Sequence, residues 1–193
     1  MSSWRTATKY ILLTGLPGVG KTTAAKYFAS KMDGVYVNSD DIRMFLFPDE
    51  RTYSPEETFA VIKESHRQVN EALREKKTVI HDALFTKHST RVRELQYALR
   101  GGAHTRLVYV TAPESAIQER MKYRTEGNKE SSEANFDFYL DRKRVFEQPP
   151  LQGTWPINNE GDTAQLEKQV DEVIREWKNE GSRELRLDSP SRK

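Results

Sequence analysis

Short apolar runs alternate along the chain with longer segments in which apolar residues recur every three or four positions. The runs predict strands buried on both faces, and the longer segments predict amphipathic helices. The expected strands are residues 9–15, 34–39, 78–82, 105–111 and 154–158. The expected helices are residues 21–32, 54–77, 87–100, 113–124, 134–147 and a last one after Asp162. This alternation predicts an α/β fold with a doubly wound, mainly parallel five-stranded sheet covered by helices on both faces.

Two helix starts carry local signals. Ser54, Pro55 and Glu57 have the spacing of a cap, a first-turn proline and a third-position acid. We expect the apolar side of this helix to comprise Phe59, Ile62, His66, Val69 and Leu73. Asp162 and Gln165 predict the start of the last helix. Its apolar face comprises Leu166, Val170, Val173, Ile174 and Trp177.

No repeat or internal linker interrupts the pattern. We therefore expect one domain over residues 1–180, with a helical lid at about 120–146. The lid includes a polar stretch, 125–133, which we expect to be mobile. Residues 181–193 have little apolar surface to bury, so we expect a disordered tail there.

Composition narrows the class of protein. The 193 residues suffice for one core, and 31 Lys and Arg against 29 Asp and Glu leave a formal charge of +2. This balance disfavours a general nucleic-acid coat but leaves a local basic groove open. The chain has no cysteine, which excludes disulfides, thiolate metal sites and cysteine nucleophiles. No apolar run approaches the roughly 20 residues that span a bilayer, so we expect no membrane partner and a cytoplasmic location.

The segment "GLPGVGKTT", residues 15–23, follows the first strand and opens the first helix. It matches the phosphate-binding pattern G-x-x-x-x-G-K-[ST] in the strand-to-helix context that the pattern requires. Glycines let loop amides converge on phosphate oxygens, a lysine can reach the β and γ phosphates, and a hydroxyl can ligate Mg²⁺. This pattern predicts a P-loop that binds a nucleoside triphosphate. The expected nucleotide-binding residues are Gly15, Pro17, Gly18, Val19, Gly20, Lys21, Thr22 and Thr23.

Acidic residues follow the two strands expected after the P-loop strand. In "NSDDIR", Ser39 is expected to cap a short helix, and that role alone would explain Asp40 and Asp41 near its positive end. The carboxyl end of a strand beside the P-loop is also where such sheets bind ligands, so either aspartate could accept a proton from a substrate hydroxyl. Arg43 would lie on the same helix face as Asp40 and hold the acceptor.

The third strand ends in Asp82, which suits either a metal or acceptor contact or a turn. His81 beside it is expected to pack in the sheet rather than to catalyse. Arg120 and Arg124 lie one turn apart before the polar stretch, so they would close over the triphosphate or form a solvated helix face. The basic run at 141–144 lines an acceptor groove or is simply a solvated surface.

Five segments in this order resemble the small P-loop kinases, an AAA-type group that includes zeta toxins and polynucleotide 5′-kinases. They are "GLPGVGKTT", "NSDDIR", "TVIHDALF", "ERMKYR" and "FEQP", and the resemblance covers about residues 9–150. It implies that Asp40 is the base, that Arg43 contacts the acceptor and that Arg120 is a lid arginine.

The chain departs from that family at "DALF", where the family has a threonine in the position of the leucine; the threonine contact to substrate or metal is therefore either missing or supplied elsewhere, with Thr86 as a candidate. The segment "INNEGDTAQLEKQV" also resembles dephospho-coenzyme A kinase, which implies that Asn158 and Asn159 border the adenine.

Together these features predict an ATP- and Mg²⁺-dependent kinase. The predicted catalytic residues are Lys21, Asp40, Arg120 and Arg124, the acceptor contacts are Asp40, Arg43 and Asp82, and the metal residues are Thr22 and Asp82. The acceptor hydroxyl stays open among a small molecule, a sugar nucleotide and a short nucleic-acid 5′ end, and the oligomeric state is not readable. The alternative is a nucleotide-dependent switch or binding module with slow ATP hydrolysis. A common GTPase would need an N-K-x-D segment, which the chain lacks.

Overall fold

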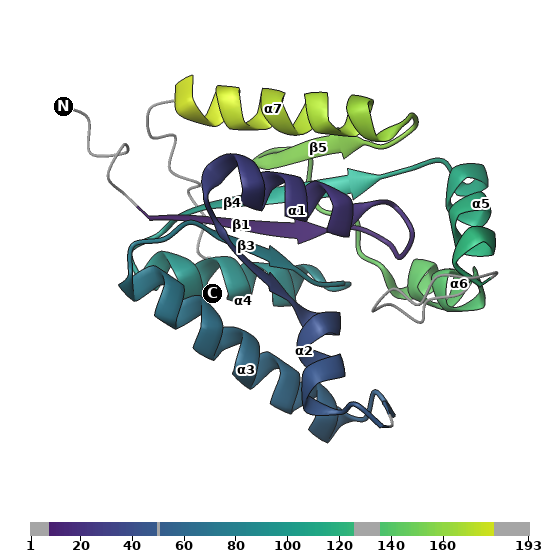
Figure 1. Cartoon of the computed structure of the whole chain (residues 1–193), viewed down its shortest axis with the longest axis horizontal. Helices are drawn as coiled ribbons and strands as arrows, with labels where there is room; N and C mark the ends of the chain where they lie inside the picture. Colours follow the sequence, from purple (N-terminus) through teal and green to yellow (C-terminus); the bar gives the residue numbers. More distant parts are fainter. Residues whose placement is uncertain (1–7, 50, 126–135, 180–193) are drawn as a thin grey trace, which may run out of the picture.

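The structure is a computed structural model that describes residues 8–49, 51–125 and 136–179. Its core is a parallel sheet of five strands in the order β2-β3-β1-β4-β5 (Figure 1). The strands are β1 (Lys9–Thr14), β2 (Val35–Asn38), β3 (Val79–Asp82), β4 (His104–Thr111) and β5 (Thr154–Asn158). All five strands predicted from the apolar runs are confirmed, as is the doubly wound P-loop fold.

Seven helices connect these strands or follow them in the described part of the chain. They are α1 (Lys21–Met32), α2 (Ser39–Leu46), α3 (Pro55–Arg74), α4 (His88–Arg100), α5 (Glu114–Thr125), α6 (Phe136–Val145) and α7 (Thr163–Asn179). Helices α1 and α7 cover one face of the sheet, and α3 and α4 cover the other (Figure 1). Helices α2, α5 and α6 lie beyond the ends toward which the strands point. None of the described helices is long and apolar enough to cross a membrane.

Strand β1 lies at the centre and contributes to both cores. Ile11 and Leu13 pack with α1 and α7, whereas Tyr10 and Leu12 pack with α3 and α4. All four side chains are buried, as expected for alternation in a parallel strand that is covered on both faces. The rigid centre of the sheet thus fixes the position of the loop that leaves β1.

Helix α7 follows the sequence prediction. Its five expected apolar residues are buried, and the Asp162 carboxylate accepts a hydrogen bond from the Gln165 amide at 2.9 Å. Ser54 likewise caps α3 by accepting from the Glu57 amide at 3.2 Å. Both caps satisfy amides that would otherwise lack partners in the first turn.

The predicted apolar face of α3 is wrong in its first half. Phe59 is 68% exposed and Ile62 is 44% exposed. The buried side of the helix instead runs through Glu57, Val61, Ser65, Val69, Ala72 and Leu73. The start of α3 contacts α2, where the buried acid Glu57 pairs with Arg43. Predictions made for residues 126–135 and 181–193 lie outside the described residues.

Candidate functional site

The P-loop joins β1 to α1 through three glycines with positive φ. Gly15, Gly18 and Gly20 have φ of 149°, 80° and 97°, a region that other residues rarely adopt. A Cβ on Gly15 would lie 2.2 Å from the Val110 carbonyl oxygen, so the neighbouring strand leaves no room for a side chain. Gly20 precedes α1 without a side-chain cap, so no side chain at the cap position occupies the first-turn amides, and a helix start of this kind suits an anion. The Lys21 Nζ donates to the Leu16 carbonyl at 3.0 Å, across the loop.

The Asp82 carboxylate lies beside the P-loop and is 1% exposed. One of its oxygens, Oδ2, accepts three hydrogen bonds. They come from Thr22 Oγ1 at 2.9 Å, Tyr36 Oη at 3.1 Å and Asn38 Nδ2 at 2.8 Å. Three donors on one oxygen fix the orientation of this carboxylate. The structure therefore brings together Thr22 and Asp82, the two predicted metal residues.

The donor set fits a magnesium ion. Mg²⁺ prefers hard oxygen ligands and usually combines one or two protein groups with phosphates and water. Thr22 and Asp82 offer a hydroxyl and a carboxylate. Among the described residues, no three His, Cys, Asp or Glu side chains lie close enough to hold a metal ion by themselves. A cation here would therefore be coordinated partly by Thr22 and Asp82 and partly by oxygens of the bound phosphates.

The residue that caps helix α2 is Asn38 rather than Ser39, which corrects the predicted cap. The Asn38 Oδ1 accepts hydrogen bonds from the amides of Asp40 and Asp41, both at 2.8 Å. Ser39 is the first residue of the helix itself. Asparagine and serine are about equally favoured as caps, so residue type alone did not decide between these two neighbours.

Asp40 lies in the field of several charged groups. Burial raises the pKa of this carboxyl, and the negative charge of Asp82 raises it further. The positive charges of Lys21 and Arg43 act in the opposite direction, and Asp41 adds a smaller upward shift. A carboxylate with a raised pKa is a stronger base than an ordinary aspartate. The residues predicted for proton abstraction and for phosphate binding are thus neighbours.

Arg43 is turned toward α3. It is 7% exposed, its Nη1 lies 2.5 Å from Glu57 Oε1, and its guanidinium lies 4.5 Å from the centre of the Tyr53 ring. Burial by itself would raise the pKa of Glu57, but hydrogen bonds from Arg43 and Thr52 outweigh it and lower the pKa to about 2. The ion pair therefore joins α2 to α3, and an acceptor contact by Arg43 stays a prediction. No sequence pattern indicated that Glu57 would pair with Arg43.

Arg120 reaches the P-loop from α5. Its Nη1 donates to the Gly18 carbonyl at 3.5 Å and its Nη2 donates to the Asn159 carbonyl at 3.1 Å. A positive charge thus lies against the phosphate-binding loop in this structure. The side chain of Arg124 lies outside the described residues, so its lid role stays a prediction.

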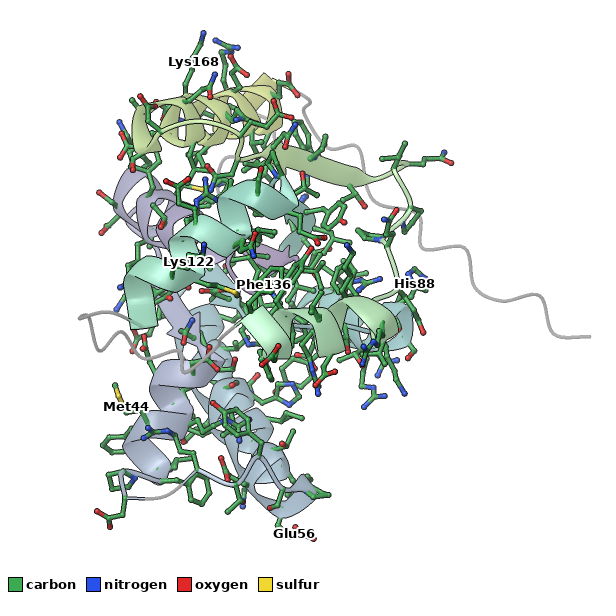
Figure 2. All side chains as sticks on the ribbon, turned by 90° about the vertical axis from the view of Figure 1, so that its right-hand side faces the viewer. Met44, Glu56, His88, Lys122, Phe136 and Lys168 are labelled. Carbon is green, nitrogen blue, oxygen red and sulfur yellow. The ribbon has the colours of Figure 1, made fainter. Side chains whose placement is uncertain are left out.

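Figure 2 views the molecule from the side toward which the strands point. Helix α2, with Met44, lies below, and α5 and α6, with Lys122 and Phe136, lie above. The predicted base belongs to the lower group and Arg120 to the upper group. The P-loop follows the central strand β1, which lies in the sheet between β2, the strand before α2, and β4, the strand before α5.

The two asparagines at the end of β5, Asn158 and Asn159, differ in environment. Asn158 is exposed, and its Oδ1 accepts from Thr111 Oγ1 at 3.3 Å. Asn159 is 6% exposed, and its Nδ2 donates to the Val19 carbonyl at 2.8 Å. A Cβ on Gly20 would lie 2.3 Å from that same nitrogen. Asn159, which follows the edge strand β5, therefore braces the P-loop by direct contact, and the sequence did not reveal this contact.

Sequence reasoning also missed Arg91 on α4, which is fully buried. It donates to the carbonyls of Phe85 at 2.7 Å, Thr86 at 3.1 Å and Glu147 at 2.6 Å. The arginine thereby ties the loop after Asp82 to the "FEQP" segment that follows α6. Nothing in its spacing distinguishes it from the other polar residues of α4.

Comparison with known proteins adds a family and a fold. The family described as an AAA domain matches residues 11–149. A gluconokinase from Sinorhizobium meliloti 1021 is similar, with a TM-score of 0.60 at 17% identity, over 91% of this chain and 98% of that one. No curated protein sequence matches the chain.

Two further similar structures contain nucleotides or their analogues. Kti12 from Chaetomium thermophilum, in complex with ADP-AlF3, has a TM-score of 0.62 at 17% identity, over 86% of this chain and 97% of that one. APS kinase from Mycobacterium tuberculosis, in complex with AMPPNP and APS, has a TM-score of 0.58 at 17% identity, over 89% of this chain and 99% of that one. At such identities these likenesses establish the fold.

Proposed function

The chain belongs to the AAA domain family, and from this membership we propose that it is an ATP-dependent kinase that transfers the γ-phosphoryl group to a hydroxyl. The observation that supports this most is the environment of Asp40. This half-buried carboxyl, whose pKa is raised, lies in the fields of Lys21 and Asp82 at the carboxyl end of the sheet. A simple nucleotide-binding module has no need of a strengthened base beside its phosphate loop. The kinases among the similar structures agree with the proposal.

In this proposal the donor is held by the P-loop. The loop amides and the first turn of α1 bind the β and γ phosphates, and the Lys21 ammonium neutralises their charge. Thr22 and Asp82 would hold Mg²⁺, which neutralises charge on the phosphate oxygens. Arg120 contacts the loop at Gly18. In this proposal its positive charge stabilises the negative charge that develops on the equatorial oxygens of the transferring phosphoryl group.

Asp40 acts on the acceptor. Its carboxylate takes the proton from the acceptor hydroxyl while the hydroxyl oxygen forms a bond to the γ phosphorus. The bond from that phosphorus to the β–γ bridging oxygen breaks, and ADP leaves with the electron pair. Positioned base catalysis of this kind is worth about 10²–10⁴ in rate. A lid at about 120–146 would exclude water and limit hydrolysis of ATP.

The acceptor is an alcohol that a screen can identify. We propose a screen with γ-labelled ATP against nucleosides, sugar nucleotides, antibiotics, sugars and oligonucleotides with a free 5′-hydroxyl. Transfer of label to one class supports the kinase and names its substrate. Release of labelled phosphate that no acceptor stimulates would instead support the nucleotide-dependent switch.

Asp40→Asn tests the base, with Asp41→Asn as the matched control on the adjacent position. We expect Asp40→Asn to bind ATP with ordinary affinity and to lose about 10²–10⁴ in the rate of transfer. Asp41→Asn should retain transfer. Unchanged transfer in Asp40→Asn together with loss in Asp41→Asn would move the base to Asp41.

A further inference from the structure

Asn38 is bonded at both ends of its side-chain amide. This last residue of β2 is 7% exposed. Its Oδ1 accepts from the amides of Asp40 and Asp41, and its Nδ2 donates to the Asp82 carboxylate, all at 2.8 Å. The reverse orientation of the amide would set its NH₂ group against two amide donors and its oxygen against a carboxylate. The network itself therefore fixes which end is which.

The amide joins two elements that carry different parts of the proposed chemistry. Asn38 and Asp82 are direct partners in the parallel pairing of β2 with β3, so their side chains leave the sheet at the same level. One side of the amide fixes the first turn of α2, which carries Asp40. The other side fixes the carboxylate that faces Thr22 and the P-loop.

No other common cap residue supplies both contacts. Serine, threonine and aspartate offer a side-chain oxygen to the first-turn amides, but serine and threonine have no second donor of this reach, and aspartate has none. An aspartate here would place a second carboxylate against Asp82. The asparagine is therefore needed for the contact to Asp82, whereas a helix cap alone would tolerate several residues.

We propose that Asn38 is a positioning residue that couples the nucleotide side of the site to α2, so that occupation of the phosphate site orders the helix that carries the base. This inference rests on the proposed function. When phosphates and Mg²⁺ engage Thr22 and Asp82, the Asp82 carboxylate is held more firmly, and the amide passes that order to the Asp40 and Asp41 N–H groups. A misplacement of about 1 Å between base and acceptor costs about 10²-fold in rate, so this register matters to the chemistry.

Hydrogen exchange of the α2 amides measures the coupling without any acceptor. In the wild-type protein, we expect Mg²⁺ with β,γ-imido-ATP to slow exchange of the Asp40 and Asp41 amides relative to the nucleotide-free protein. This slowing adds to the protection that the Asn38 cap already gives without nucleotide. The expected slowing is about tenfold, the factor that one hydrogen bond to a charged group supplies at the low end of its range. Titration calorimetry with the same analogue, with and without Mg²⁺, gives the affinities.

Two variants separate the cap from the coupling. Asn38→Ser keeps an oxygen for the α2 amides and removes the donor to Asp82, so exchange in the free protein should stay close to that of the wild type while the nucleotide-induced slowing is lost. Tyr36→Phe is the matched control, since it removes a different donor from the same Asp82 oxygen without touching α2. It should weaken Mg²⁺-dependent binding yet retain the slowing at α2.

The outcomes distinguish this inference from the proposed function. Equal slowing in the wild type and in Asn38→Ser, or no slowing in the wild type, overturns the coupling. Slowing that depends on Asn38 in a protein that phosphorylates none of the acceptors overturns the kinase proposal and leaves the coupling standing. Should Asn38→Ser fail to fold, the comparison of the wild type with Tyr36→Phe still decides whether α2 responds to the nucleotide.

Discussion

Replacement of Asn159 by alanine should loosen the P-loop, although this residue lies far from the loop in sequence. The Asn159 amide donates to the Val19 carbonyl at 2.8 Å, and its own backbone carbonyl accepts from Arg120 at 3.1 Å. Both Asn159 and Val19 are buried, at 6% and 2% exposure. Asn159→Ala therefore removes the hydrogen bond and leaves a carbonyl of the phosphate-binding loop without its partner.

The size of the effect follows from that burial. A buried polar group left unsatisfied costs about 1–3 kcal/mol, and for a chain of this size each kcal/mol lowers Tm by about 2–4 °C. We expect Asn159→Ala to melt about 2–12 °C below the wild type. If the loosened loop must be reordered at each binding event, affinity for the phosphates falls about fivefold for each kcal/mol.

The assay is thermal unfolding together with calorimetric titration of inorganic tripolyphosphate, which reports on the P-loop without the adenine. Asn158→Ala is the matched control, because that side chain is exposed and its removal should change stability by no more than about 0.5 kcal/mol. Because Asn158 is predicted to border the adenine, Asn158→Ala should weaken the binding of ATP but not that of tripolyphosphate. An Asn159→Ala protein that melts and binds tripolyphosphate like the wild type would refute the bracing role.

Three further predictions concern the metal, the α2–α3 ion pair and the base. Thr22→Val should bind Mg²⁺-free nucleotide normally but lose the gain in affinity that Mg²⁺ gives, measured by titration calorimetry with and without EDTA; an unchanged gain would exclude Thr22 as a ligand. Glu57 has a pKa lowered from 4.5 to about 2, so its ionised form stabilises the fold above pH 4.5 and that contribution is lost as the pH falls toward 2. Glu57→Gln should be less stable at neutral pH and should show a flatter loss of stability across that window in acid unfolding followed by circular dichroism; identical acid profiles would contradict the pairing. Because burial, Asp82 and Asp41 raise the pKa of Asp40, the acid limb of the pH–rate profile should lie above that of an ordinary aspartate, and Asp41→Asn should move it to lower pH; a limb that stays in place would show that another group titrates.

The sequence predicted what local rules decide. Buried strands read as apolar runs because both faces of a parallel sheet are covered, and the caps at Ser54 and Asp162 read correctly because cap and partner lie three residues apart. The P-loop could be predicted from the sequence for the same reason. Its glycines, lysine and threonine act within one strand-to-helix turn, and their backbone conformations are set mainly by residue type.

The rotation of α3 was decided by tertiary contacts. The apolar periodicity of the sequence allowed two adjacent faces to turn inward, and Phe59 and Ile62 belong to the face that stays exposed. The face that turns inward carries Val61, Val69, Ala72 and Leu73 together with Glu57, which pairs with Arg43 on a different helix. Helical periodicity does not carry this kind of information, because a charged pair is equally compatible with a solvated surface until its partner is known.

The sequence by itself determined the five strands, the phosphate-binding loop and the acidic residues just after β2 and at the end of β3, since each depends on neighbours a few positions away. Only the tertiary structure decided how these parts are held together. Asn38 meets Asp82 across 44 positions, and Asn159 meets the P-loop across 140. Such contacts depend on strand order and register, which bring distant residues to the same level of the sheet and which no local pattern encodes.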